Sequence, residues 1–187
     1  MAETASEAGP RLNQGDIIKN IEFLESMSEE DGILEVTKIS FPFVIVLTQD
    51  CDLEQDHKFR TEEVKTQDKL LLSALLAPLY NAEHVFEGQH LSELDITSQQ
   101  INKKRTQGTD LLRNNNPRYH YLEFPAEVQL VPLIIDFKHY FAARVADLEA
   151  ARTQQLVYSV RPLFREDISQ RFAAFLSRIG LPSLVLP

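Results

Sequence analysis

The sequence predicts a single domain of the α+β class, and three observations support this. Several short runs of apolar and β-branched residues are typical of strands, a polar segment between two of them has helical character, and the last part of the chain carries an amphipathic pattern. The chain has 187 residues, which suits one domain with an embellishment. With 43% hydrophobic and 25% charged residues, the composition excludes a wholly disordered chain.

The N-terminal region contains a tail and the start of the first strand. Residues 1–12 are small, polar and acidic, and we expect a flexible tail there, followed by one domain over residues 13–187. A turn signal at Gln14 and Gly15 precedes Asp16 and two isoleucines, which indicates where a strand begins. Residues 33–39 partly alternate between apolar and polar side chains and are also strand-like.

The strongest strand prediction covers residues 41–47, FPFVIVL, which are apolar at nearly every position and should be buried on both faces. Pro42 is expected only at the start of this strand, because proline cannot donate to a ladder of hydrogen bonds. Residues 54–68 are polar and predict a loop or an exposed helix. A second buried strand is expected over residues 70–79, ending near Pro78.

An insertion is expected over about residues 80–118. It has helical character as far as about residue 113 and ends in the turn signal Asn114-Asn115-Asn116-Pro117. His84 and His90 lie six residues apart, on different helical faces, and are expected to be surface or loop histidines. Strands are expected again over residues 119–124, 128–137 and 139–145.

The C-terminal region predicts an amphipathic helix over about residues 162–179. Its apolar side chains fall mostly three and four residues apart: Leu163, Phe164, Ile168, Phe172, Phe175, Leu176 and Ile179. Pro162 suits the first helical position, and Gly180 followed by Pro182 is typical of a helix end. The apolar face either packs on the domain or binds a protein partner or a second copy of the chain.

The formal net charge of -9 is distributed unevenly along the chain. Residues 1–35 hold nine acidic and two basic side chains, a net -7, and residues 36–187 hold nineteen acidic and seventeen basic ones, a net -2. The acidic total argues against a broadly cationic, phosphate-binding surface. A local basic stretch remains, which is either a solvated helix face or a site that contacts RNA or DNA: Lys103, Lys104, Arg105, Arg113 and Arg118.

Cysteine usage and hydropathy exclude further classes of protein. The single cysteine, Cys51, forbids an internal disulfide and a zinc site built from several cysteines. No apolar run approaches the length of a membrane span, and the acidic N-terminus is unlike a signal peptide. We therefore expect a cytoplasmic protein without membrane association, and nothing in the sequence calls for a cofactor.

Residues 48–52, TQDCD, are the most unusual local feature, and they directly follow the strongest predicted strand. Cys51 is a poor candidate nucleophile, because the negative charges of Asp50 and Asp52 disfavour its thiolate. A cysteine hydrolase would also need a histidine from elsewhere in the fold, such as His120 or His139.

The two aspartates offer a second chemical possibility, a divalent-cation site. Carboxylates two residues apart in a turn can converge on one ion, and His57 is a third candidate ligand. The simpler interpretation is a structural turn, in which Asp50 and Asp52 accept hydrogen bonds from backbone amides and Cys51 is a small buried side chain.

Aromatic and imidazole rings gather in the late strands beside Arg118 and Lys138. They either fill the core or form a platform on which nucleic-acid bases or a peptide stack: Tyr119, His120, Tyr121, Phe137, His139, Tyr140 and Phe141.

The order of these elements resembles the PemK/MazF-like family of small barrels built from strongly bent strands. Residues 14–18, QGDII, match the family's opening strand, residues 44–48 its second element and residues 75–79 its third. Residues 131–145 resemble the closing strand pair. The resemblance implies a small, strongly bent β-barrel over about residues 14–148, interrupted by the insertion, and a bacterial toxin–antitoxin or defence-type setting.

Two departures from the family pattern bear on activity. The RNA-cleaving members carry Arg-Pro just before the second strand, where this chain has Phe41-Pro42. A threonine or serine is also missing after Pro78, which Leu79 follows. Without a preorganised cation, phosphodiester cleavage loses a large stabilising contribution. The resemblance therefore predicts a catalytically degenerate module that binds nucleic acid or a protein partner. The alternative is a hydrolase centred on Asp50, Cys51 and Asp52, with or without a metal.

Overall fold

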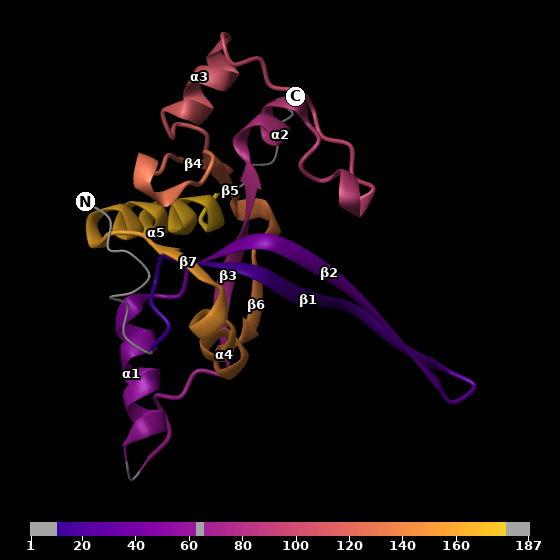
Figure 1. Cartoon of the computed structure of the whole chain (residues 1–187), viewed down its shortest axis with the longest axis vertical. Coiled ribbons are helices and arrows are strands. Elements are labelled where there is room, and N and C mark those ends of the chain that lie inside the picture. Colours follow the sequence, from indigo (N-terminus) through magenta and orange to yellow (C-terminus); the bar gives the residue numbers. More distant parts are fainter. Residues whose placement is uncertain (1–10, 63–65, 179–187) are drawn as a thin grey trace, which may run out of the picture.

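The computed structural model describes residues 11–62 and 66–178, which form an α+β fold around one antiparallel sheet (Figure 1). The strands among these residues are β1 (Asp16–Glu30), β2 (Ile33–Val46), β3 (Ser73–Asn81), β4 (Tyr119–Leu122), β5 (Leu133–Asp136), β6 (Phe141–Arg144) and β7 (Leu156–Ser159). The helices are α1 (Asp50–Thr61), α2 (Ala82–Glu87), α3 (Thr106–Leu112), α4 (Val145–Gln155) and α5 (Pro162–Leu176). Short 3-10 helices lie at Ser92–Leu94, Ala126–Val128 and Phe137–His139.

The sheet is open and not a closed barrel. Its strand order is β4-β5-β3-β2-β1-β7, and β6 pairs with the first half of β3. The end strands β4 and β7 do not pair with each other in the described part of the chain. β3 is the centre of the sheet: one of its edges pairs with β2, while the other pairs with β6 at Ser73–Leu76 and then with β5 at Leu79–Asn81.

Both prolines expected at strand ends lie inside strands. Pro42 is well within β2, and this corrects the expectation that it starts the strand. In the pairing of β2 with β1, Phe43 lies opposite Lys19 and Phe41 lies opposite Ile21. Asn20, between the two paired residues of β1, has a φ of 57°. The pairing of β2 with β3 begins at Phe43. Neither neighbour therefore uses the missing N–H of Pro42. Pro78 lies in the middle of β3, where that strand changes its partner from β6 to β5.

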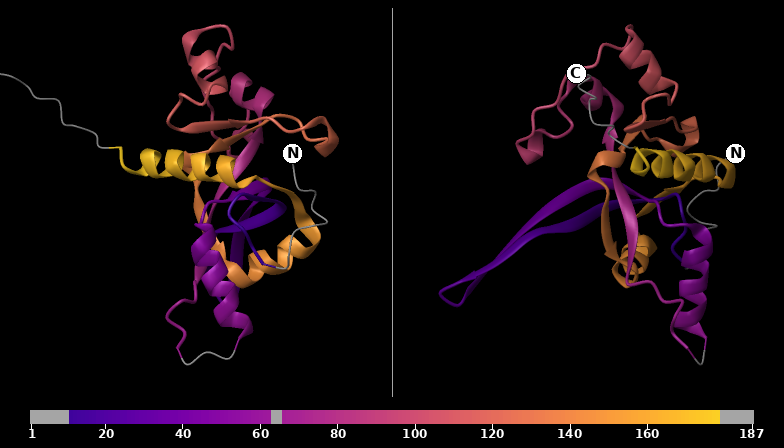
Figure 2. Two further views of the ribbon diagram at one scale, coloured as in Figure 1. Left: turned by 90° about the vertical axis from the view of Figure 1, so that its left-hand side faces the viewer. Right: turned by 180° about the vertical axis from the view of Figure 1, so that it is seen from behind.

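β1 and β2 form one long hairpin instead of separate short strands. Its inner part belongs to the sheet, because residues 16–18 pair with β7 and residues 43–46 with β3. Its outer part pairs only with itself and projects from the rest of the chain (Figure 2). The tip turns at Asp31 and Gly32, with φ values of 51° and 78°, which is the left-handed geometry of a two-residue hairpin turn.

The two faces of the sheet bury separate apolar clusters. Helix α5 covers one face, where Ile168, Phe172 and Phe175 pack around the buried Phe137. Helix α4, which the sequence did not predict, covers part of the other face through Val145 and Leu148. The predicted C-terminal helix is confirmed over Pro162–Leu176, while its expected stop at Gly180 and Pro182 lies outside the described residues.

The predicted insertion contains α2, α3 and the 3-10 turn at Ser92–Leu94, and it has a small apolar cluster of its own around Val85, Phe86 and Leu111. Within the predicted polar segment, residues 54–61 belong to α1, so the helical alternative holds for this part. Among the described residues, no helix has the length and apolar character needed to cross a bilayer. At the N-terminal end, Leu12 is buried in the core, so the packed chain includes the last part of the expected tail.

Asp16 connects the first strand to the end of the chain. Its carboxylate is fully buried and accepts hydrogen bonds from Arg152 Nε at 2.5 Å, from Ser159 Oγ at 2.5 Å and from the Asn13 amide at 2.9 Å. These partners lie on α4, on β7 and in the loop before β1. A buried carboxylate needs such compensation, so Asp16 specifies how these three segments assemble.

We expect Arg152→Met to destabilise the fold, because it leaves the buried Asp16 carboxylate without its cation. The expected loss in the free energy of unfolding is about 3–5 kcal/mol, measured by urea denaturation. The double variant Asp16→Asn/Arg152→Met should lose less than the sum of the two single changes. As a matched control, Arg144→Met removes the exposed pair with Asp147 at 3.9 Å and should cause no measurable change. Equal effects of the two arginine variants would contradict this role of Asp16.

Candidate functional site

Asp136, the last residue of β5, organises a buried polar cluster. Arg118 donates to its two carboxylate oxygens from Nε at 2.8 Å and from Nη2 at 2.5 Å. The Lys138 amide donates to Oδ1 at 3.0 Å. The Nδ1 atom of His139 lies 2.9 Å from Oδ2, which is an ion-pair distance, although the ring N–H is not aligned for a hydrogen bond. Asp136 thus has partners in the turn that follows β5 and, through Arg118, directly before β4.

The electrostatics of this cluster keep Asp136 ionised. Burial alone would raise the pKa of the carboxyl, but Arg118 and His139 outweigh burial and lower its pKa to about 2. Burial likewise opposes the charge of Arg118, yet the hydrogen bond and the charge of Asp136 raise the pKa of the guanidinium. The pair is therefore a fixed salt bridge at neutral pH.

The local sequence explains how these side chains come together. β5 runs through the core as LIID, and its final carboxylate caps the 3-10 helix Phe137–His139 by accepting from the Lys138 amide. This sharp turn places Lys138 and His139 next to the end of β5. Arg118 comes from the other direction, because it directly precedes β4, whose Tyr119 pairs with Asp136.

A cavity of about 420 Å³ lies beside the cluster. Its charged or ionisable lining consists of Arg118, Lys138 and His139, and no aspartate or glutamate lines it within the part of the chain that the structure describes. Arg118 is 27% exposed while Asp136 is fully buried, so the wall presents the guanidinium and not the carboxylate. Further lining comes from Leu91, Ile96, Thr97, Ser98, Gln99, Ile101, Gln107, Asn116 and Tyr119. The chemistry of this wall suits an anion.

A second cavity, of about 370 Å³, is mostly apolar and lies against β2 and β3. Phe41, Pro42, Phe43 and Leu79 line it together with Tyr80 and His90. His90 stands between the two cavities: its ring contacts Tyr80 edge-on at 5.1 Å between centroids, and it contacts Tyr119, which lines the first cavity, at 6.1 Å.

His90 is a buried neutral histidine in the loop after α2. A loop was one of the two expected positions, and the other, at the surface, is wrong for this residue. Its side chain is only 1% exposed, and burial lowers its pKa to about 4. Neither ring nitrogen has a hydrogen-bond partner among the described residues, and Nε2 lies 4.0 Å from Asp136 Oδ2. The Tyr80 hydroxyl is also buried without such a partner, and burial raises its pKa. His90 and Tyr80 therefore form an uncharged wall between the cavities.

Comparison with protein-family models, with curated proteins and with solved structures gives no match to this chain. The interpretation of the site therefore rests on its own geometry.

The predicted basic stretch divides into two groups in the structure. Lys103 forms an ion pair with Glu83 at 2.5 Å and lies over the Phe86 ring, and Arg118 is paired with Asp136. In contrast, Lys104, Arg105 and Arg113 are exposed and form no ion pair within the described residues. Three of the five predicted basic residues thus have no ion pair in the described part of the chain. The cavity also contains Lys138, which the predicted stretch did not include.

The predicted stacking platform is mostly core. Tyr119, His120, Phe137 and Phe141 are buried, which supports the packing interpretation for these rings. Tyr140 remains exposed beside His139, with its ring edge-on to Phe172 at 5.3 Å.

Within the TQDCD segment, Asp50, Cys51 and Asp52 form the first turn of α1, and Gln49 precedes it as the N-cap. Asp50 accepts from the Gln14 amide at 3.2 Å and forms ion pairs with Arg11 at 3.1 Å and with Arg165 at 3.2 Å. Cys51 is exposed, so the expectation of a buried thiol is wrong. Asp50 therefore has a structural role, which is to fix the start of α1 against the N-terminal segment and α5.

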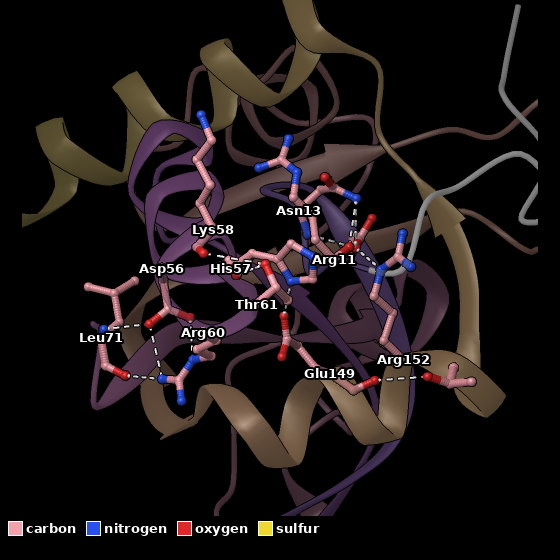
Figure 3. Close-up of polar contacts among 12 residues, drawn as sticks. Arg11, Asn13, Asp56, His57, Lys58, Arg60, Thr61, Leu71, Glu149 and Arg152 are labelled. Carbon is pink, nitrogen blue, oxygen red and sulfur yellow. Dashed lines mark hydrogen bonds and ion pairs between the residues drawn. The ribbon is translucent and has the colours of Figure 1, made fainter. Parts of the chain in front are cut away.

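The three candidate metal ligands do not come together. His57 bonds Glu149 Oε1 on α4 through Nδ1 at 3.1 Å, as Figure 3 shows, and Asp52 is exposed. The same view shows the buried Asp56, which binds Arg60 and the Leu71 amide. In the described part of the chain no group of three or more His, Cys, Asp or Glu side chains is arranged to hold a metal ion.

We expect the stability of the protein to fall as the pH falls from about 6.5 to about 4. Burial lowers the pKa of His90 to about 4, and burial together with Arg171 lowers that of His120 to about 4. In this window the unfolded chain binds protons at both histidines and the native chain does not, so protonation favours unfolding. Each pKa unit corresponds to about 1.4 kcal/mol.

The measurement is urea denaturation at intervals between pH 7 and pH 4. His120→Phe should reduce the slope of the free energy of unfolding against pH by the share of one buried histidine. An unchanged slope in this variant would contradict the assignment. Below about pH 4 a further loss is expected, because the unfolded chain binds a proton at Asp136 while the native carboxyl, with its pKa of about 2, stays ionised.

Proposed function

We propose that this chain is a catalytically degenerate PemK/MazF-like module that binds single-stranded nucleic acid in a bacterial toxin–antitoxin or defence-type setting. The observation that carries the proposal is the cavity beside Asp136, which presents Arg118, Lys138 and His139 without a lining carboxylate in the described residues. Lys138 is exposed at this cavity and forms no ion pair within the described residues, so its charge is available to an anionic ligand.

The surroundings of the cavity extend the anion site toward a polymer. Lys104, Arg105 and Arg113 belong to the same insertion that supplies Ile101 and Gln107 to the cavity wall. Their free charges supply further contacts to a phosphate backbone. Tyr140, exposed next to His139, offers a face on which an unpaired base can stack. Base stacking of this kind requires a single strand, and this is why we favour single-stranded over double-stranded nucleic acid.

The second cavity supports binding without cleavage. Phe41 and Leu79 occupy the positions at which the RNA-cleaving members of the resembled family carry arginine and threonine or serine, and both line this cavity. No lysine or arginine is among its described lining residues. A site of this composition lacks a cation to stabilise the charge that develops on a phosphate during cleavage.

A strong bend of the sheet, which the resemblance implies, is part of the same proposal. Its support is the path of β3, which pairs with β6 and then with β5 along a single edge. The alternative hydrolase has no comparable support, because Asp50 is held by two arginines and His57 is paired with Glu149.

A protein partner is the second candidate, and exposed apolar residues on α5 favour it. Leu163 is 80% exposed at the start of the helix, Phe164 lies beside it, and Leu176 is exposed near its end. Among the described residues, these are the members of the amphipathic pattern that the sheet does not cover, so a partner can bind α5 without disturbing the core.

We expect the wild-type chain to bind a short single-stranded RNA at low salt, measured by fluorescence anisotropy with a labelled oligonucleotide. Lys138→Ala should weaken binding for all sequences, and the slope of the logarithm of affinity against that of salt concentration should fall by about 1. The combined change Lys104→Ala/Arg105→Ala should reduce the slope further.

The matched control is Lys58→Ala, which removes an exposed lysine on α1, away from the cavity. It should leave affinity and salt dependence unchanged. Arg118 is not a suitable probe, because its loss would leave Asp136 buried without a cation. Absence of binding at low salt, or equal effects of Lys138→Ala and Lys58→Ala, would refute nucleic-acid binding at this cavity.

A further inference from the structure

His90 and Tyr80 bury polar atoms that have no hydrogen-bond partner in the described part of the chain. The side chain of His90 is 1% exposed, and both of its ring nitrogens lack a partner there. The buried Tyr80 hydroxyl lacks one as well. Buried polar groups in folded proteins are almost always hydrogen-bonded, so these atoms point to a partner that is not part of the protein.

Both side chains line the second cavity, the one of about 370 Å³ against β2 and β3. Their rings meet edge-on at 5.1 Å between centroids, so one small ligand can reach both. Pro42, Glu93 and Val131 belong to the same lining and are exposed, which places the opening of the cavity at the surface. The volume lies within the range of about 300–1,000 Å³ that is usual for small-molecule sites.

The two polar side chains carry no charge at neutral pH. Burial lowers the pKa of His90 to about 4 and raises that of Tyr80. A neutral imidazole has one nitrogen that donates and one that accepts, and a tyrosine hydroxyl can do both. The pair therefore suits a neutral ligand group that itself both donates and accepts. A carboxamide and a lactam are groups of this kind.

The rest of the lining favours an apolar, aromatic body for the ligand. Phe41 and Leu79 are buried in the cavity wall, and Phe43 is half-buried. Water can satisfy polar atoms in a cavity, but it gains no hydrogen bond from these side chains. An aromatic ring, in contrast, packs against the phenylalanines and covers them.

The charge of the lining excludes an anion from this cavity. No lysine or arginine is among its described lining residues, and the carboxylate of Glu93 lies at its opening. A negatively charged ligand would lose its hydration without gaining a cation. The second cavity thus differs in chemistry from the cationic cavity beside Asp136.

We propose that the second cavity binds a small uncharged aromatic molecule that carries a carboxamide or lactam group. The polar group of this ligand forms hydrogen bonds with His90 and Tyr80, and its ring packs against Phe41, Phe43 and Leu79. This site goes beyond the proposed function and does not depend on nucleic acid.

The test titrates the full chain at neutral pH with three probes, observed by saturation-transfer NMR: benzamide, benzoate and N,N-dimethylbenzamide. Benzamide is expected to bind with a dissociation constant of about 1–10 mM, as suits a ligand of its size. Benzoate, which has the same shape, should bind at least about tenfold more weakly because the cavity offers no cation. The dimethyl compound should bind at least about fivefold more weakly, because it has no N–H to donate.

Two variants assign the binding to this cavity. Tyr80→Phe removes only the hydroxyl and should weaken benzamide binding at least about fivefold, and His90→Phe should also weaken it. Tyr80→Phe should not lower the melting temperature, because the hydroxyl has no partner within the described residues. The matched control is Tyr158→Phe, which removes a hydroxyl on β7, outside the described lining, and should leave the affinity unchanged.

The inference is overturned if benzamide does not bind the wild type in the millimolar range, since the cavity would then hold water only. Benzoate binding as tightly as benzamide also overturns it, as do equal affinities of Tyr80→Phe and Tyr158→Phe. A loss of stability in Tyr80→Phe would show that the hydroxyl serves the fold and not a ligand. No nucleic acid is present in these titrations, so their failure is distinct from a failure of the proposed function.

Discussion

The ionised carboxylate of Asp136 is the constraint on which the candidate site depends. A charge with no exposed surface has to be compensated within the protein, and here Arg118, His139 and the Lys138 amide supply the compensation. Because these groups must reach one carboxylate, the end of β5, the start of β4 and the turn after β5 are fixed relative to one another. Arg118, Lys138 and His139, which these contacts hold in place, form the cationic wall of the cavity.

Two other buried aspartates are also compensated by an arginine. Asp16 is held by Arg152 and Asp56 by Arg60, and all three aspartates are fully buried. Each pair fixes a junction: Asp16 joins β1 to α4 and β7, while Asp56 joins α1 to the segment before β3 through the Leu71 amide. A buried ion pair adds little net stability compared with an apolar pair of similar volume. A buried charge that loses its partner, in contrast, strongly destabilises the fold. Such pairs therefore select one assembly of the segments over the alternatives.

The strands and the C-terminal helix could be predicted because their signal is local. The apolar run of residues 41–47 predicts a strand, and the three- and four-residue spacing of apolar residues after Pro162 predicts a helix. Helix α4 could not, since Val145 and Leu148 are its only buried apolar positions among eleven residues. The continuity of β2 through Pro42 was also hidden, because it depends on the irregular backbone at Asn20 on the neighbouring strand. Contacts of this kind, between residues far apart in the chain, cannot be predicted from a short stretch of sequence.

The candidate site was predictable only in part, for the same reason. The sequence identified the basic residues and the rings near Arg118, but it treated five cations as one group. Their separation depends on Glu83 and Asp136, which reach Lys103 and Arg118 from other elements. The burial of His90 in its loop could not be predicted, because it comes from Tyr80 and Tyr119, which lie on β3 and β4. Asp136 itself gives the one usable signal, a single carboxylate that ends the apolar run LIID.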